Sequence, residues 1–135
     1  MKALAKRFNQ DTEVWALTGL IHDLDWEITK ETPQRHPLLA VEILQKEGFS
    51  PEVVEAVAKH NHLHNFQPET LLEKALYSRE EITGLIVATA LVMPNKKLNE
   101  VTVDKVLAKF KEKSFAKGVN REIILKCEEF LGLKF

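Results

Sequence analysis

The sequence predicts an all-α fold, and three observations support this class. Apolar residues recur at three- and four-residue spacing along most of the chain, and no segment alternates apolar and polar residues as a half-buried strand does. The five glycines and five prolines fall almost entirely between these periodic segments. A chain of 135 residues with 44% hydrophobic side chains is also long enough to bury one core. We therefore expect a single helical domain over residues 1–135.

The first two helices are predicted from the spacing of their apolar residues. Residues 2–8 fit the end of a helix, because Leu4 and Phe8 are four residues apart and a polar turn follows them. Residues 12–24 place apolar side chains around most of a helical cylinder, which is typical of a central buried helix. Residues 28–35 are polar and contain a proline, so we expect a loop there.

The next two helices have clear start and stop signals. One runs from about residue 36 to residue 46 and ends before Gly48, a residue that suits the left-handed conformation after a helix. The other begins after Ser50, which can cap a helix and precedes a first-turn proline, and it continues to His60.

Three further helices complete the predicted bundle. Pro68 opens a long helical pattern that ends at Leu91, just before a Pro-Asn pair. Thr102 and Asn120 can each cap one of the last two helices, and Gly132 ends the final one.

Composition excludes several classes of protein. Nineteen basic and twenty acidic residues leave a formal net charge of -1, so no specific nucleic-acid binding is expected. The longest apolar run, residues 82–93, is about half of the roughly 20 residues needed to span a bilayer. The single cysteine, Cys127, excludes an internal disulfide, and the N-terminal residues do not form a signal peptide. We expect a cytoplasmic protein without a membrane span.

Residues 19–25, with the sequence GLIHDLD, place an imidazole beside two carboxylates at the end of an apolar helix. His22 and Asp23 can reach one cation if the end of the helix turns them inward. Nitrogen and oxygen ligands together suit Mn, Fe, Co, Ni, Zn or, less well, Mg. In the alternative interpretation, His22 interacts with the helix dipole and Asp23 caps the helix or bonds to the loop.

The other histidines lie between residues 36 and 64. His60 and His64 are four residues apart and would share one face, suitable for a metal ion, if the helix continued that far. The residues around His62 and His64 favour loops, so we expect these two side chains to be exposed.

A basic stretch forms the second candidate site. Residues 103–126 contain seven basic and three acidic side chains. Lys113, Lys117 and Arg121 are spaced by four and lie near the helix start predicted at Asn120, where backbone N–H groups favour an anion. These three residues could hold a phosphate group; the alternative is a solvated basic face.

Five segments in this order carry a family resemblance: Leu20–Asp25, His36–Leu44, Val57–Asn61, Ala75–Leu85 and Phe110–Arg121. Together they resemble the HD-domain metal-dependent phosphohydrolases, in particular the small single-domain HDIG-type hydrolases, and the resemblance covers nearly the whole chain. It implies an HD-domain-like helical bundle with a metal centre, in which His22 and Asp23 match the central His-Asp pair.

This sequence departs from the family pattern in two places. The first metal histidine would lie on a helix before the segment that matches residues 4–8, and no histidine precedes His22. The domain is therefore expected to be shortened at its N-terminus. Glu80 stands where the last ligand would be an aspartate, so its carboxylate is one methylene farther from the backbone. Arg79 beside it would compete with a metal ion for that carboxylate.

Histidines between the His-Asp pair and the last carboxylate add a second metal in some family members, and His36 and His60 stand at such positions. The implied ligands of the divalent ion are thus His22, Asp23, His36, His60 and Glu80. Asp23 would take part in catalysis, and Asp25 could position water or protonate a leaving group. The alternative for Asp25 is a solvated loop carboxylate.

The expected function is metal-dependent hydrolysis of a small phosphorylated or nucleotide-like substrate. The alternative is a catalytically degenerate HD-fold module that binds a ligand or mediates oligomerisation. A missing N-terminal helix would leave an apolar groove on the bundle, so we expect a homodimer or a larger homo-oligomer.

Overall fold

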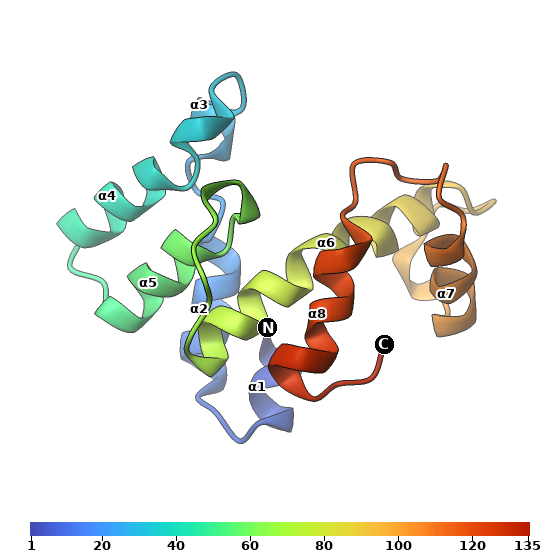
Figure 1. Cartoon of the computed structure of the whole chain (residues 1–135), viewed down its shortest axis with the longest axis horizontal. Coiled ribbons are helices and arrows are strands. Elements are labelled where there is room, and N and C mark those ends of the chain that lie inside the picture. Colours follow the sequence, from blue (N-terminus) through green and yellow to red (C-terminus); the bar gives the residue numbers. More distant parts are fainter. The chain divides into compact units, whose positions relative to one another are not determined.

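A computed structural model describes all residues 1–135, and every regular element in it is a helix. Three short 3-10 turns separate the α-helices: η1 (Pro33–Arg35), η2 (His62–His64) and η3 (Leu98–Glu100). The α-helices, labelled in Figure 1, are α1 (Lys2–Arg7), α2 (Thr12–Ile21), α3 (Trp26–Thr29), α4 (Leu38–Lys46), α5 (Pro51–Lys59), α6 (Leu71–Leu91), α7 (Val103–Lys111) and α8 (Arg121–Leu131). The all-α prediction is confirmed.

The chain forms two compact units, residues 1–77 and residues 78–135, and α6 runs through both. The expectation of one domain over the whole chain stays a prediction. None of the helices has both the length and the apolar character needed to cross a membrane.

The first unit is built around α2, α4 and α5. Helix α5 packs against both α2 and α4, while α1 packs against α2 (Figure 1). Gly19 on α2 leaves room for Met1, because a Cβ at this position would collide with the Met1 side chain. The hydrophobic cluster under these helices contains Ala40, Leu44, Val54 and Val57, with Ile21, Val41 and Phe49 packed against it. Burial of these side chains holds the C-terminal ends of α2 and α5 near each other.

Two predictions about the segment 12–35 are wrong. Helix α2 ends at Ile21 rather than near Leu24, because the chain enters a turn at His22. The short α3 follows and overlaps the start of the predicted loop. Helix α2 is also not buried on all sides: Trp15 is buried, whereas Leu20 is 79% exposed.

Most predicted helix ends agree with the structure. The Thr102 hydroxyl accepts the backbone N–H of Lys105, and the Asn120 side chain caps α8. Gly48 and Gly132 have positive φ angles of 76° and 62°, as expected for residues that follow helices. Ser50 occupies the N-cap position of α5, but its side chain makes no capping hydrogen bond.

The second unit has its own hydrophobic core. The buried residues Leu85, Val106 and Ile124 come from α6, α7 and α8 respectively. Glu81 on α6 accepts the backbone N–H of Asn120 at 2.8 Å, which ties the start of α8 to α6.

Helix α6 begins at Leu71, three residues after Pro68, because Thr70 and Glu73 form a capping box. The Glu73 backbone N–H donates to the Thr70 hydroxyl, and the Glu73 carboxylate accepts the backbone N–H of Thr70, both at 3.3 Å. The same carboxylate accepts from the backbone of Glu69 at 2.6 Å and from Lys59 Nζ at 3.1 Å. Burial by itself would raise the pKa of Glu73, but these donors outweigh it and hold the pKa below its usual value.

We expect Glu73→Gln to lower the free energy of unfolding by about 1–2 kcal/mol at pH 7, because glutamine keeps the capping geometry but loses the ion pair with Lys59. Since the pKa of Glu73 is lower in the folded than in the unfolded chain, its contribution is complete above the unfolded value of about 4.3 and disappears as the pH falls through the folded value. Urea unfolding between pH 7 and pH 3 measures both effects.

The matched control is Glu69→Gln, which removes an exposed carboxylate near the same Lys59 and should change stability by less than about 0.5 kcal/mol. A pH-independent difference between wild type and Glu73→Gln would contradict the assignment.

Candidate metal centre

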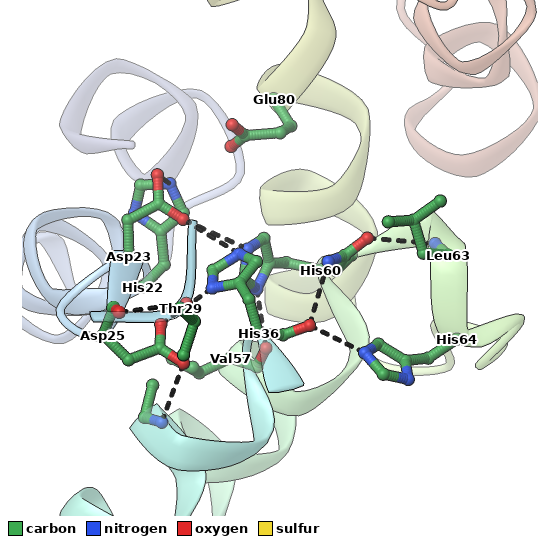
Figure 2. Close-up of polar contacts among 12 residues, drawn as sticks. His22, Asp23, Asp25, Thr29, His36, Val57, His60, Leu63, His64 and Glu80 are labelled. Carbon is green, nitrogen blue, oxygen red and sulfur yellow. Dashed lines mark hydrogen bonds and ion pairs between the residues drawn. The ribbon is translucent and has the colours of Figure 1, made fainter. Parts of the chain in front are cut away.

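The carboxylate of Asp23 lies at the centre of three imidazole rings (Figure 2). His22 Nε2 is 3.1 Å from Asp23 Oδ2. The Nε2 atoms of His36 and His60 are 3.3 and 3.4 Å from Asp23 Oδ1. All three rings are largely buried, with His36 5% and His60 3% exposed, whereas the Asp23 side chain is 42% exposed. The cluster therefore opens to solvent through Asp23.

His22 and His60 are held by the ends of their own helices. Each is the C-cap residue, His22 of α2 and His60 of α5. His22 Nδ1 lies 3.0 Å from the carbonyl oxygen of Gly19, and His60 Nδ1 lies 2.6 Å from that of Val57. These carbonyls belong to the last turn of each helix, where carbonyl groups lose their regular partners four residues further on. The Val57 carbonyl also accepts the backbone N–H of His60, at 3.5 Å. The two helix ends thus set the orientation of both rings.

His36 is held differently, by a buried carboxylate. It lies outside the α-helices, as the extended residue that follows η1. Its Nδ1 donates to Asp25 Oδ1 at 2.7 Å, and Asp25 Oδ2 accepts the backbone N–H of Ala40 at 3.2 Å. Ala40 lies in the first turn of α4, where the helix dipole favours a negative charge. Asp25 is therefore a link between the start of α4 and the His36 ring.

These contacts determine which ring nitrogen carries the proton. Carbonyl and carboxylate oxygens only accept hydrogen bonds, so all three Nδ1 atoms must donate. In the neutral rings, the Nε2 lone pairs then face the Asp23 carboxylate, and they repel it unless a proton or a metal cation lies between. Three added protons would charge three rings whose centroids are about 5 Å apart along the cluster.

A single divalent cation fits this donor set better than three protons. The ligand atoms of His22, Asp23 and His60 all lie within 4.8 Å of one another, as a shared ion requires. Histidine ligands in metal sites typically donate their other ring N–H to a carbonyl or carboxylate, which is the arrangement found for all three rings here. The predicted metal role of His22, Asp23 and His60 therefore has a geometric basis, and His36 faces the same carboxylate.

Charge at the cluster favours a cation as well. Burial by itself would raise the pKa of Asp23, but when the rings of His22, His36 and His60 are protonated, their hydrogen bonds from Nε2 hold it well below its usual range. Burial would lower the pKa of His36, but Asp23 and Asp25 outweigh it and raise that pKa. The negative potential that favours a proton on His36 also favours a metal ion.

Asp25 does not fit the alternative interpretation of its sequence position. It is fully buried rather than a solvated loop carboxylate, and its two oxygens bind His36 and Ala40. These contacts assign Asp25 to the positioning of His36. Its predicted role as a catalytic acid stays a prediction.

The segment after α5 corrects the prediction for His62 and His64. Helix α5 ends at Lys59, so His60 and His64 do not share a helical face. Both His62 and His64 are half-buried rather than exposed. His64 Nε2 lies 2.7 Å from the main-chain oxygen of His36, and Asn61 Nδ2 donates to the same oxygen at 3.1 Å. Sequence spacing gives no signal for these contacts.

Glu80 lies on α6 in the second unit. Its Oε2 is 3.8 Å from Arg79 Nη2, so the expected cation beside this carboxylate is present. The role of Glu80 as a metal ligand stays a prediction.

Arg121 is occupied by the main chain of its own unit. Its Nε donates to the carbonyl of Phe110 at 2.8 Å, and its Nη2 donates to the carbonyls of Glu112 and Phe115 at 2.9 and 2.7 Å. This fork of donors folds the segment between α7 and α8 around one guanidinium. Lys113 and Lys117 in that segment are exposed. Phosphate binding by the three residues stays a prediction, and Arg121 has a structural role in any case.

Comparison with known families agrees with this description. The family model described as HD domain matches residues 1–104. This chain belongs to the HD domain family. No curated protein and no solved structure matches the chain. The matched range contains the histidine cluster and the whole of α6.

We expect Asp25→Asn to invert the proton position on His36. The Ala40 N–H requires an oxygen on the new side chain, so the amide nitrogen must face His36 and force Nδ1 to accept. The proton then moves to Nε2, which can no longer bind a metal ion. Ring ¹⁵N NMR measures the tautomer, and metal affinity should fall about 10–100-fold.

Asp104→Asn is the matched control, because Asp104 is exposed on α7 and should leave the histidine signals unchanged. Retention of the Nδ1–H form of His36 in Asp25→Asn would refute the proposed positioning.

We expect Arg121→Lys to destabilise the protein by about 2 kcal/mol or more, because lysine keeps the charge but loses the planar fork that binds several carbonyls. Lys117→Ala, an exposed change in the same segment, should cost less than about 0.5 kcal/mol. Urea unfolding followed by circular dichroism compares the two variants. Equal stability of Arg121→Lys and wild type would show that the guanidinium is not needed for folding.

Proposed function

We propose that this chain is a metal-dependent phosphohydrolase that acts on a small phosphorylated substrate. One observation carries the proposal: three imidazole rings, each with Nδ1 committed to an acceptor, turn Nε2 toward a single carboxylate. Membership of the HD domain family supports the reaction class, because such domains are typically metal-dependent phosphohydrolases. The substrate class that this reaction implies is a small phosphorylated or nucleotide-like molecule.

The residues of the cluster would have two roles, to hold the ion and to orient the histidine rings. His22, Asp23 and His60 would hold the ion, and His36 would be the further nitrogen ligand beside them. A divalent ion bound there supplies a Lewis acid that neutralises phosphoryl charge and makes water more acidic. The buried rings keep their orientation because Gly19, Val57 and Asp25 fix Nδ1. Asp23 is the ligand on the solvent side, where a substrate can approach.

The proposed function is tested by metal content and hydrolysis together. Protein purified without chelator should retain about one divalent transition-metal ion per chain, measured by inductively coupled plasma mass spectrometry. The double variant His22→Ala, Asp23→Ala should lose this ion and lower hydrolysis of p-nitrophenyl phosphate or nucleoside monophosphates by about 100-fold or more. Chelation should abolish wild-type hydrolysis, and added Mn²⁺, Ni²⁺ or Co²⁺ should restore it.

Glu13→Ala is the matched control, because it removes a carboxylate from α2 that is 82% exposed. Its metal content and hydrolysis should equal those of the wild type. Absence of bound metal in the wild type, even after incubation with these ions, would refute the proposal.

A ligand-binding module without turnover is the second candidate function. The Arg79 guanidinium 3.8 Å from Glu80 favours it, because this cation competes with a metal ion for the carboxylate. Retention of metal in the wild type together with no hydrolysis of any phosphate ester would support this candidate over the enzyme.

A further inference from the structure

His36 is the one histidine of the cluster whose Nδ1 partner is distant in sequence. The Nδ1 partners of His22 and His60 lie three residues before them, on their own helices. The side-chain partners of the His36 ring and main-chain oxygen lie 11, 25 and 28 residues away in sequence. His36 lies between η1 and α4, and its backbone N–H donates to the carbonyl of Pro33 at 3.2 Å, the last bond of η1. Its main-chain oxygen takes no part in a helical hydrogen-bond ladder and is held by side chains instead.

The main-chain oxygen of His36 accepts two side-chain hydrogen bonds. Asn61 Nδ2 donates at 3.1 Å, and His64 Nε2 lies at 2.7 Å (Figure 2). A carbonyl oxygen has two lone pairs, and these two donors account for both. Asn61 and His64 therefore hold the backbone of His36, while Asp25 holds its ring.

We propose that Asn61 and His64 are positioning residues, which place His36 at the metal centre by donating hydrogen bonds to its main-chain oxygen. This inference rests on the proposed metal-dependent function. It assigns a role to the 3-10 turn η2, which contributes no atom to the three-residue cluster of His22, Asp23 and His60.

The hydrogen bond of His64 separates it chemically from the three cluster histidines. Because the acceptor is a carbonyl, Nε2 of His64 must carry the proton, whereas His22, His36 and His60 carry theirs on Nδ1. Its ring stacks on Phe66, with the centroids 5.9 Å apart and the planes inclined by 15°. The stacking limits rotation of the ring and keeps the donor pointed at His36.

Asn61 connects the positioning turn to the cluster itself. Its Oδ1 accepts the backbone N–H of Leu63 at 2.9 Å, so both ends of the amide are used. Asn61 also directly follows His60, which faces the same Asp23 oxygen as His36 does. A short segment after α5 therefore sets the positions of two rings of the cluster relative to each other.

The test compares three variants of the chain of residues 1–135. His64→Ala removes the donor, while His64→Gln replaces it with an amide N–H at similar reach from the backbone. Leu63→Ala is the matched control, because its side chain is 58% exposed on the same turn and its backbone N–H is retained. The dissociation constant for Co²⁺ is measured from visible absorption, and thermal unfolding confirms that each variant is folded.

We expect His64→Ala to weaken Co²⁺ binding about 10–100-fold, as for other residues that orient a metal ligand. His64→Gln should restore binding to within about threefold of wild type, and Leu63→Ala should leave it unchanged. Wild-type affinity in His64→Ala would overturn the inference. Equal weakening in His64→Gln and His64→Ala would overturn it too, because the donated hydrogen bond would then be irrelevant.

A second measurement separates this inference from the proposed function. If the wild type binds no Co²⁺, the proposed function fails, and ring ¹⁵N NMR of the metal-free protein tests the positioning alone. The Nδ1–H signal of His36, bonded to buried Asp25, should be sharp in wild type and His64→Gln and broadened or lost in His64→Ala. An unchanged signal in His64→Ala would overturn the inference without any reference to metal.

Discussion

The hydrogen bonds at Nδ1 of the three histidines are the constraint on which the candidate metal centre depends. An imidazole has two nitrogens, and an acceptor on one decides what the other can do. In His22 and His60 the acceptor is a carbonyl in the last turn of a helix. One bond thus satisfies a backbone group at a helix end and directs Nε2 toward Asp23. The residues at which α2 and α5 end therefore matter for the cluster. One residue more or less in either helix would turn the imidazole ring away from Asp23.

Hydrophobic packing brings these two helix ends together at one site. Ile21 and Val57, which are one and three residues before His22 and His60, contribute to the same apolar cluster. The packing that joins α2 to α5 therefore also sets the separation of the two rings. Helix α4 belongs to this cluster and offers the N–H of Ala40 to Asp25. The same helices thus form the apolar core and hold the polar cluster, both within residues 1–77.

Local signals in the sequence predicted much of the fold and part of the site. Caps at Thr102 and Asn120 and the glycine after α8 were readable because each acts within a few residues. The capping box of Thr70 and Glu73 has an equally local pattern, which would have corrected the predicted start of α6. The His22-Asp23 pair was predicted from adjacency, and His36 and His60 from a family resemblance. Burial of Asp25 and the bond from His64 were missed, because contacts across 11 and 28 residues leave no periodic trace.

The difference between near and distant partners has a consequence for how the centre assembles during folding. The rings of His22 and His60 acquire their tautomers as soon as α2 and α5 form, because their partners belong to the same turn of chain. The ring of His36 can be oriented only after α4 has docked and the turn after α5 has formed, because these segments supply the contacts to Asp25 and to the His36 main chain. A chain that has its secondary structure but not its tertiary packing would hold two correctly prepared imidazoles and lack the third. We therefore expect the candidate centre to be completed late in folding, when the His36 side chain becomes ordered.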